Sequence, residues 1–233
     1  MILEGRLKLI ADLVPSCDTL ADVGTDHGYI PVYCVQQGKC RRAIAMDVNP
    51  QPLDRADANI KKYNLTESIS TRLSDGVQKL SPDEADVIVI AGMGGQLIMN
   101  ILEAGKDIIT DNTLLILQPM LAAKELREFL SGNGYDICGE YVSREENKFY
   151  NIITVRRGKA EITDDDIYIG RNLADNSPDV YKDYLEYKIR VNEKILAGLR
   201  QSSAAELCAS ERATHWRYLP TMMAKLYSKN ILP

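Results

Sequence analysis

The segment from Leu20 to Pro31 constrains the fold most, because it reads as the end of a buried strand, a tight turn and the start of a helix. Within it, Asp22, Gly24 and Gly28 have the spacing D-x-G-x-x-x-G. Gly24 allows the chain to turn sharply, and Gly28 lets a ligand or the next helix approach the backbone closely. A strand, turn and helix in this order are typical of an α/β protein.

The turn differs from the dinucleotide fingerprint G-x-G-x-x-G, because Asp26 stands where that pattern has a glycine. A carboxylate at this position would lie where a pyrophosphate needs free N–H groups. The turn therefore favours a ligand with a cationic or zwitterionic end, such as S-adenosylmethionine (SAM), over a dinucleotide such as NAD. An ordinary strand-to-helix turn without a ligand is the alternative, and this segment alone does not decide between the two.

Length and composition limit the class of protein. The 233 residues have room for one α/β domain and a smaller appendage, and the net charge of −5 does not by itself indicate a nucleic-acid partner. The five cysteines are odd in number, scattered and without a C-x-x-C pair, which favours reduced thiols over a disulfide framework or a zinc site. The chain starts without a secretory signal, and no run approaches the roughly 18 apolar residues of a membrane span. We therefore expect a cytoplasmic protein with no membrane contact and no metal.

Strand and helix patterns alternate along the first part of the chain. The expected strands cover residues 18–23, 42–46, 69–73, 85–91, 113–118, 135–142 and 149–156. The expected helices cover residues 4–14, 28–37, 51–63, 96–106 and 120–132. Near-continuous apolar strands predict a mainly parallel sheet covered on both faces, closed by an antiparallel hairpin. This is the layout of a Rossmann-like class I SAM-dependent methyltransferase.

The composition changes after about residue 158. Residues 159–179 are acidic and read as a linker with helical fragments, and a heptad pattern follows from Tyr181 to Lys229. This pattern predicts a coiled-coil-like antiparallel helical hairpin, with the second helix interrupted at Pro220. We therefore expect a catalytic domain over 1–158 and a helical domain over 159–233.

The helical domain is locally basic. Residues 180–229 contain nine Lys or Arg and five Asp or Glu. The aromatic residues Tyr184, Tyr187, Trp216, Tyr218 and Tyr227 are interleaved with them. Such a surface can bind a phosphate backbone and stack on exposed bases. Solvated helix faces or a dimerising hairpin would produce a similar composition, so these alternatives stay open.

Acids and glycines follow four of the expected strands, at the end of the sheet where ligands bind in such folds. Asp47, about 20 residues after the turn, can accept hydrogen bonds from ribose hydroxyls, as in both NAD and SAM proteins. Asp75 and Gly76 follow the third strand, where SAM enzymes often contact adenine, although a plain turn is the alternative. The full set predicted to bind the cofactor is Asp22, Gly24, Asp26, His27, Gly28, Asp47, Val48, Asp75, Gly76, Ala91, Gly92 and Met93.

A second set of residues is expected on the substrate side. The Asp26 carboxylate could stabilise positive charge on a methylated ring, and its alternative role is to hold the amino group of SAM. The predicted catalytic residues are Asp26, Gln118 and Asn151. The predicted substrate-binding residues are His27, Tyr29, Gly94, Gly95, Pro119 and Tyr150. Ordinary packing is the alternative for the residues after the fifth strand and in the last hairpin.

Four segments taken together resemble the TrmK family of bacterial tRNA methyltransferases: Asp22–Pro31, Ala91–Gly95, Leu117–Pro119 and Phe149–Asn151. The resemblance implies SAM as methyl donor, N1 of adenine 22 in tRNA as acceptor, and a helical tail that helps to hold the tRNA. We expect the protein to act as a monomer. The alternatives are a methyltransferase for another RNA base or a small molecule, an NAD-dependent oxidoreductase, and a non-catalytic RNA-binding module.

Overall fold

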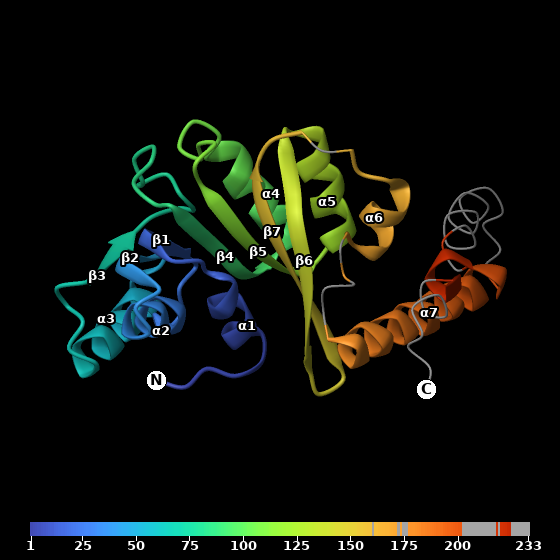
Figure 1. Cartoon of the computed structure of the whole chain (residues 1–233), viewed down its shortest axis with the longest axis horizontal. Helices are drawn as coiled ribbons and strands as arrows, with labels where there is room; N and C mark the ends of the chain where they lie inside the picture. Colours follow the sequence, from blue (N-terminus) through green and yellow to red (C-terminus); the bar gives the residue numbers. More distant parts are fainter. Residues whose placement is uncertain (160, 172, 174–176, 202–217, 219, 225–233) are drawn as a thin grey trace. The chain divides into compact units, whose positions relative to one another are not determined.

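The structure is a computed structural model that describes residues 1–159, 161–171, 173, 177–201, 218 and 220–224. The chain divides into two compact units, Met1–Glu161 and Ile162–Pro233. The first unit contains the sheet and the second contains the C-terminal helices (Figure 1).

The first unit is built on one seven-stranded sheet in the order β3-β2-β1-β4-β5-β7-β6. The strands are β1 (Cys17–Val23), β2 (Cys40–Asp47), β3 (Ile69–Leu73), β4 (Val87–Gly94), β5 (Leu114–Leu121), β6 (Tyr135–Glu145) and β7 (Lys148–Arg157). The first five strands are parallel, whereas β7 runs antiparallel to both β5 and β6. The predicted Rossmann-like sheet with an antiparallel closing hairpin is therefore confirmed.

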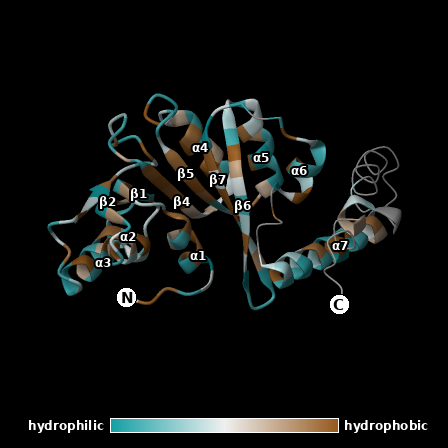
Figure 2. Cartoon of the chain, in the orientation of Figure 1, coloured by the Kyte–Doolittle hydropathy of each residue, from teal (hydrophilic) through white to brown (hydrophobic). Residues whose placement is uncertain are grey.

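Helices cover both faces of this sheet. They are α1 (Gly5–Leu13), α2 (Tyr29–Gln36), α3 (Pro50–Lys62), α4 (Gly95–Ala104) and α5 (Ala123–Gly132). Residues from α1, α2 and α3 share one core cluster with alternate residues of the strands, such as Val87 and Val89 of β4. The intervening residues Ile88 and Ile90 are also buried, on the face where α4 and α5 pack (Figure 1). Burial on both faces explains the apolar strands at the centre of Figure 2.

Several strands run further than the sequence predicted, and two of them, β4 and β5, do so beside the cavity end of the sheet. Strand β4 continues through Gly92 and Met93, and β5 continues through Pro119 to Leu121. The cause is irregular pairing, in which Met93 lies opposite Pro119 and Gly94 opposite Leu121, with register shifts between these pairs. A proline is tolerated in a strand where the regular ladder is interrupted.

The second unit contains α6 (Asp164–Ile169) and α7 (Pro178–Gln201). The Tyr168 hydroxyl donates a hydrogen bond of 2.5 Å to Oδ1 of the buried Asn192, and the ring of Tyr168 stacks on that of Tyr218. Residues 218 and 220–224 are helical, whereas 202–217, 219 and 225–233 lie outside the described residues. The predicted helical hairpin therefore stays a prediction. Within the described part of the chain, no helix is both long enough and apolar enough to cross a membrane.

The close approach of the β4 and β5 ends gives a first prediction. A Cβ atom on Gly95 would lie 2.8 Å from the Leu121 carbonyl oxygen and 2.7 Å from that of Ala122, both of which are backbone atoms. We expect Gly95→Ala to lower the free energy of unfolding by about 1–3 kcal/mol, because the two chain segments must move apart. The neighbouring Gly94 has open space at its Cβ position, so Gly94→Ala is the matched control and should change stability by less than about 0.5 kcal/mol. Thermal unfolding of the two variants compares them, and equal stabilities would contradict this packing.

Candidate active site

The turn after β1 is held by backbone hydrogen bonds. The N–H groups of Gly24 and Thr25 both donate to the Met46 carbonyl oxygen of β2, at 2.8 Å each. Gly24 has φ = +78° and Gly28 has φ = +66°, a region that residues with a side chain rarely adopt. A Cβ on Gly28 would also lie 3.2 Å from the Ala56 side chain, so α2 and α3 pack closely at this point. The glycine spacing therefore fixes both the turn and the start of α2.

A cavity of about 510 Å³ opens beside this turn. It lies between the ends of β1, β4 and β5, where the strand order reverses between β1 and β4. Open α/β sheets bind ligands at this switch point. The residues that line the cavity are Arg6, Leu7, Asp22, Gly24, Thr25, Asp26, His27, Tyr29, Ile30, Ala91, Gly92 and Gln118.

Asp22 is the buried acid of this cavity. Burial away from water raises the pKa of its carboxyl to about 6, and the nearby Asp47 adds to the shift, while the neighbouring Thr25 hydroxyl opposes it. Among the residues that the structure describes, no lysine or arginine forms an ion pair with Asp22. A buried carboxylate that faces a cavity and forms no ion pair within the protein is suited to bind a cationic group of a ligand.

Arg6 contributes the opposite charge, and the sequence analysis missed it. Its guanidinium lies 2.6 Å from Oε2 of Glu145, at the end of β6, and 4.9 Å from the ring centre of Tyr150 in β7. The backbone N–H of Arg6 also donates to Glu145, and a side chain on Gly5 would collide with that carboxylate. The start of α1 is thus anchored to the β6–β7 hairpin. The signal for this residue in the sequence was a lone arginine at the start of the helix that precedes β1.

The mouth of the cavity contains a small polar and aromatic cluster. Asp26 forms an ion pair with Arg55 of α3, and its other carboxylate oxygen lies 3.3 Å from Nε2 of His27. The rings of His27 and Tyr29 are stacked with centres 5.0 Å apart, and both side chains are partly exposed. Arg55 was also missed by the sequence analysis, because nothing in a helix sequence shows which loop its side chain reaches.

Gln118 is fully buried, and its amide is engaged within the protein. Its Oε1 atom accepts a hydrogen bond of 3.1 Å from the Gly92 N–H, and its Nε2 donates to the Pro119 carbonyl oxygen at 3.0 Å. The side chain therefore ties the end of β4 to the end of β5. This geometry gives Gln118 a positioning role in the wall of the cavity.

Several predicted residues do not line this cavity. Asp47 accepts a hydrogen bond from the Asn49 N–H and is near enough to Asp22 to raise its pKa. Asp75 lines a separate hollow of about 260 Å³ together with residues of α4. The other predicted residues outside the lining are Gly28, Val48, Gly76, Met93, Gly94, Gly95, Pro119, Tyr150 and Asn151. Of these, Tyr150 lies next to the cavity through its contact with Arg6, and Met93 packs over Gly24.

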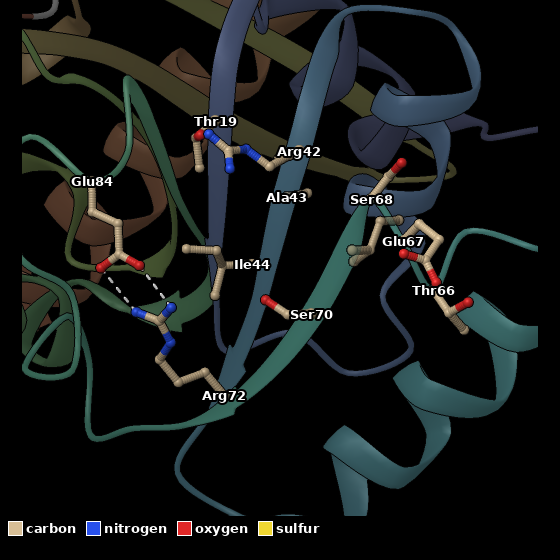
Figure 3. A pocket seen from close by; sticks show the side chains of 11 residues that line it. Thr19, Arg42, Ala43, Ile44, Thr66, Glu67, Ser68, Ser70, Arg72 and Glu84 are labelled. Carbon is tan, nitrogen blue, oxygen red and sulfur yellow. Dashed lines mark hydrogen bonds and ion pairs between the residues drawn. The ribbon is translucent and has the colours of Figure 1, made fainter.

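A further hollow of about 330 Å³ lies on the sheet itself, over β1, β2 and β3 (Figure 3). Its two arginines already have acidic partners, since Arg72 pairs with Glu84 at 2.7 Å and Arg42 with Asp18 at 3.2 Å. The strand ends that bear Asp22 and Gly92 do not contribute to it. The cavity beside the glycine turn is therefore the better candidate for the active site. No group of three or more His, Cys, Asp or Glu residues in the described ranges is arranged to hold a metal ion.

Comparisons with known proteins show which protein families and solved structures this chain is similar to. A family model described as "Methyltransferase domain" matches residues 3–153. The tRNA (adenine(22)-N(1))-methyltransferase of Bacillus subtilis is 37% identical over 171 residues, which are 73% of this chain and 72% of that protein. The crystal structure of the B. subtilis m1A22 tRNA methyltransferase TrmK has a TM-score of 0.81 and 29% identity, and covers 97% of this chain and 99% of that one. A structure of Streptococcus pneumoniae Sp1610 in complex with S-adenosyl-L-methionine has a TM-score of 0.82 and 32% identity, over 97% and 100% of the two chains.

The bridge made by Gln118 gives a second prediction. We expect Gln118→Leu to lower the free energy of unfolding by about 1–3 kcal/mol, because the substitution leaves the Gly92 N–H and the Pro119 carbonyl without this partner. Urea denaturation measures the change. The exposed Gln96 donates a hydrogen bond to Asn100 of its own helix, so Gln96→Leu is a control that should have little effect. A Gln118→Leu variant as stable as the wild-type protein would contradict the bridging role.

Proposed function

Since the chain belongs to the TrmK family of tRNA (adenine(22)-N1)-methyltransferases, we propose that it transfers the methyl group of SAM to N1 of adenine 22 in tRNA. The observation that carries this proposal is the cavity at the switch point of the sheet, in which a buried acid and an arginine face the same space. These two charges match the zwitterionic amino-acid end of SAM.

The residues of the cavity fit this cofactor. Asp22 would bind its ammonium group and Arg6 its carboxylate, because each supplies the opposite charge. Asp47, at the end of β2, would accept hydrogen bonds from the ribose hydroxyls. The turn needs a glycine at position 24 because the backbone there is left-handed. Since glycine has no side chain, the cavity stays open at this point. SAM supplies a methyl carbon bonded to a sulfonium sulfur, which the lone pair of a ring nitrogen can attack without a strong base.

The protein's contribution to the chemistry is then alignment and charge. N1 lies on the Watson–Crick edge of adenine, so a paired base must be opened and turned into the cavity, at a cost of a few kcal/mol. The stacked rings of His27 and Tyr29 form a partly exposed aromatic platform at the cavity mouth. We propose that this platform supports the adenine, since aromatic side chains commonly stack on unpaired bases.

We propose that Asp26 stabilises the positive charge that methylation leaves on the ring. Its ion pair with Arg55 holds the carboxylate in place and also balances part of its charge, so the effect is smaller than that of an isolated carboxylate. The other two predicted catalytic residues have supporting roles in this proposal. Gln118 holds the ends of β4 and β5 together. Asn151, next to Tyr150 in β7, contacts the adenine or the residues around it.

The second unit, Ile162–Pro233, is proposed to bind the tRNA. The support for this is its excess of lysine and arginine over residues 180–229 and the helix α7 that carries part of it. Phosphate contacts of this kind strengthen binding without reading the base sequence. We further propose that the protein works in the cytoplasm as a monomer.

Nucleoside analysis tests the proposed function. After incubation of the protein with SAM and an unmodified tRNA, mass spectrometry should detect one 1-methyladenosine per tRNA. A tRNA with guanine in place of adenine 22 is the control and should stay unmethylated. Methylation of a different base, or of small molecules alone, would contradict the proposal. It would indicate a methyltransferase for another RNA base or for a small molecule.

The raised pKa of Asp22 predicts pH-dependent cofactor binding. The ligand's ammonium group binds the ionised carboxylate, which the free protein loses as the pH falls below about 6. We expect the Kd for S-adenosylhomocysteine to be about tenfold higher at about pH 5 than at about pH 7. Isothermal titration calorimetry measures this Kd. The Asp22→Asn variant should bind S-adenosylhomocysteine weakly, and its Kd should depend little on pH. A slope that persists in Asp22→Asn would assign the titration to a group other than Asp22 and contradict this prediction.

Arg6 gives a second test of cofactor binding. We expect Arg6→Ala to raise the KM for SAM by at least about tenfold, because a charge-assisted hydrogen bond to the carboxylate contributes about 1.5–3 kcal/mol. Lys8 lies on the same helix and pairs with Asp12 at the surface, so Lys8→Ala is the matched control. Steady-state kinetics at saturating tRNA compare the two variants. An unchanged KM for SAM in Arg6→Ala would remove Arg6 from the cofactor site.

A further inference from the structure

Three cysteines that are scattered in the sequence come together at the end of the sheet opposite the active site. Cys17 begins β1, Cys40 begins β2, and Cys34 lies in α2. The two strands are adjacent and parallel, and Cys17 and Cys40 are direct register partners. The spacing of these residues in the sequence gave no indication of this pairing.

The three thiols differ in their access to solvent. Cys34 and Cys40 are buried in one core cluster, at 0% and 4% exposure, and the half-buried Cys17 packs against that cluster from its edge. An oxidant from solution can therefore reach Cys17, and Cys17 in turn contacts a buried thiol. None of the three lines the cavity beside the glycine turn.

The surroundings make Cys17 the more acidic thiol of the pair. The interaction between the two thiols lowers the pKa of Cys17 and raises that of Cys40. Lys39 also lowers the pKa of Cys17, and its ammonium group is fixed by hydrogen bonds to the carbonyl oxygens of Asp12 and Val14. Burial and the charges of Asp18 and Asp86 oppose the shift but do not reverse it.

The backbone brings the two residues to a suitable distance for a bond. Adjacent strands lie about 4.8 Å apart, which falls within the Cα–Cα range of about 4.4–6.8 Å found for disulfides. We propose that Cys17 and Cys40 form a reversible intramolecular disulfide when the protein meets a hydroperoxide. This would be a modification site that is separate from the methyl-transfer site and independent of the proposed function.

The reaction balances with one equivalent of hydrogen peroxide. The Cys17 thiolate attacks one oxygen, the O–O bond breaks, and after proton transfer the products are a Cys17 sulfenic acid and water. The Cys40 sulfur then attacks the Cys17 sulfur and displaces the second oxygen as water. Two thiols are oxidised by two electrons in total, and the peroxide is reduced to two molecules of water. A thiol reductant such as dithiothreitol reverses the bond by exchange.

Peptide mapping of the full-length protein tests the proposal. The protein is treated with one equivalent of hydrogen peroxide, and free thiols are then blocked. Digestion by trypsin together with a protease that cleaves before aspartate places Cys17, Cys34 and Cys40 on separate peptides, 12–17, 26–39 and 40–41. We expect a linked species of peptides 12–17 and 40–41, lighter than their sum by two hydrogen atoms and absent after dithiothreitol treatment.

Two variants make the test specific. In Cys40→Ser the link should disappear, and the Cys17 sulfenic acid should become available to dimedone. Cys138 is exposed and lies in β6, so Cys138→Ser is the matched control and should form the link as the wild-type protein does. The proposal is overturned if the oxidised wild-type protein keeps Cys17 as a free thiol, or if Cys17 links to Cys34 or to a second chain instead. The wild-type measurement decides the question even if Cys40→Ser fails to fold.

Discussion

The carboxyl end of β1 is the point on which the rest of the site depends. There the backbone leaves the sheet through Gly24 and is held to β2 by two hydrogen bonds to one carbonyl oxygen of Met46. Because the strand order reverses between β1 and β4, a cavity opens above this end. The sheet buries Asp22 at the floor of that space, and this burial raises the pKa of its carboxyl to about 6, so a bound cationic group would stabilise the ionised form.

The other parts of the cavity follow from this arrangement. Gln118 joins the ends of β4 and β5, and Gly95 lets the segment after β5 approach the start of α4. Helix α1 brings Arg6 to the opposite wall, where Glu145 and Tyr150 fix its side chain. Contacts within the protein therefore hold these parts of the site in place, which suits a reaction that needs alignment more than acid–base catalysis.

Much of the fold could be predicted from the sequence, because apolar strands alternating with amphipathic helices allow few other arrangements. The glycine turn was predictable for a similar reason, since a tight turn between a buried strand and a helix has a specific glycine pattern. Arg6 and Arg55 could not be predicted. Each reaches the site from an element that is distant in the sequence, and periodicity does not show where a long side chain points. Gln118 was predicted as catalytic, but only the structure shows that its amide is used within the protein.

The most direct measurement is a crystal structure of the full-length protein with S-adenosylhomocysteine. The account predicts the ligand's ammonium group within hydrogen-bond distance of Asp22, its carboxylate at Arg6 and its ribose at Asp47. A ligand bound in the hollow over β1, β2 and β3, or bound beside the glycine turn with its ammonium group away from Asp22, would contradict it.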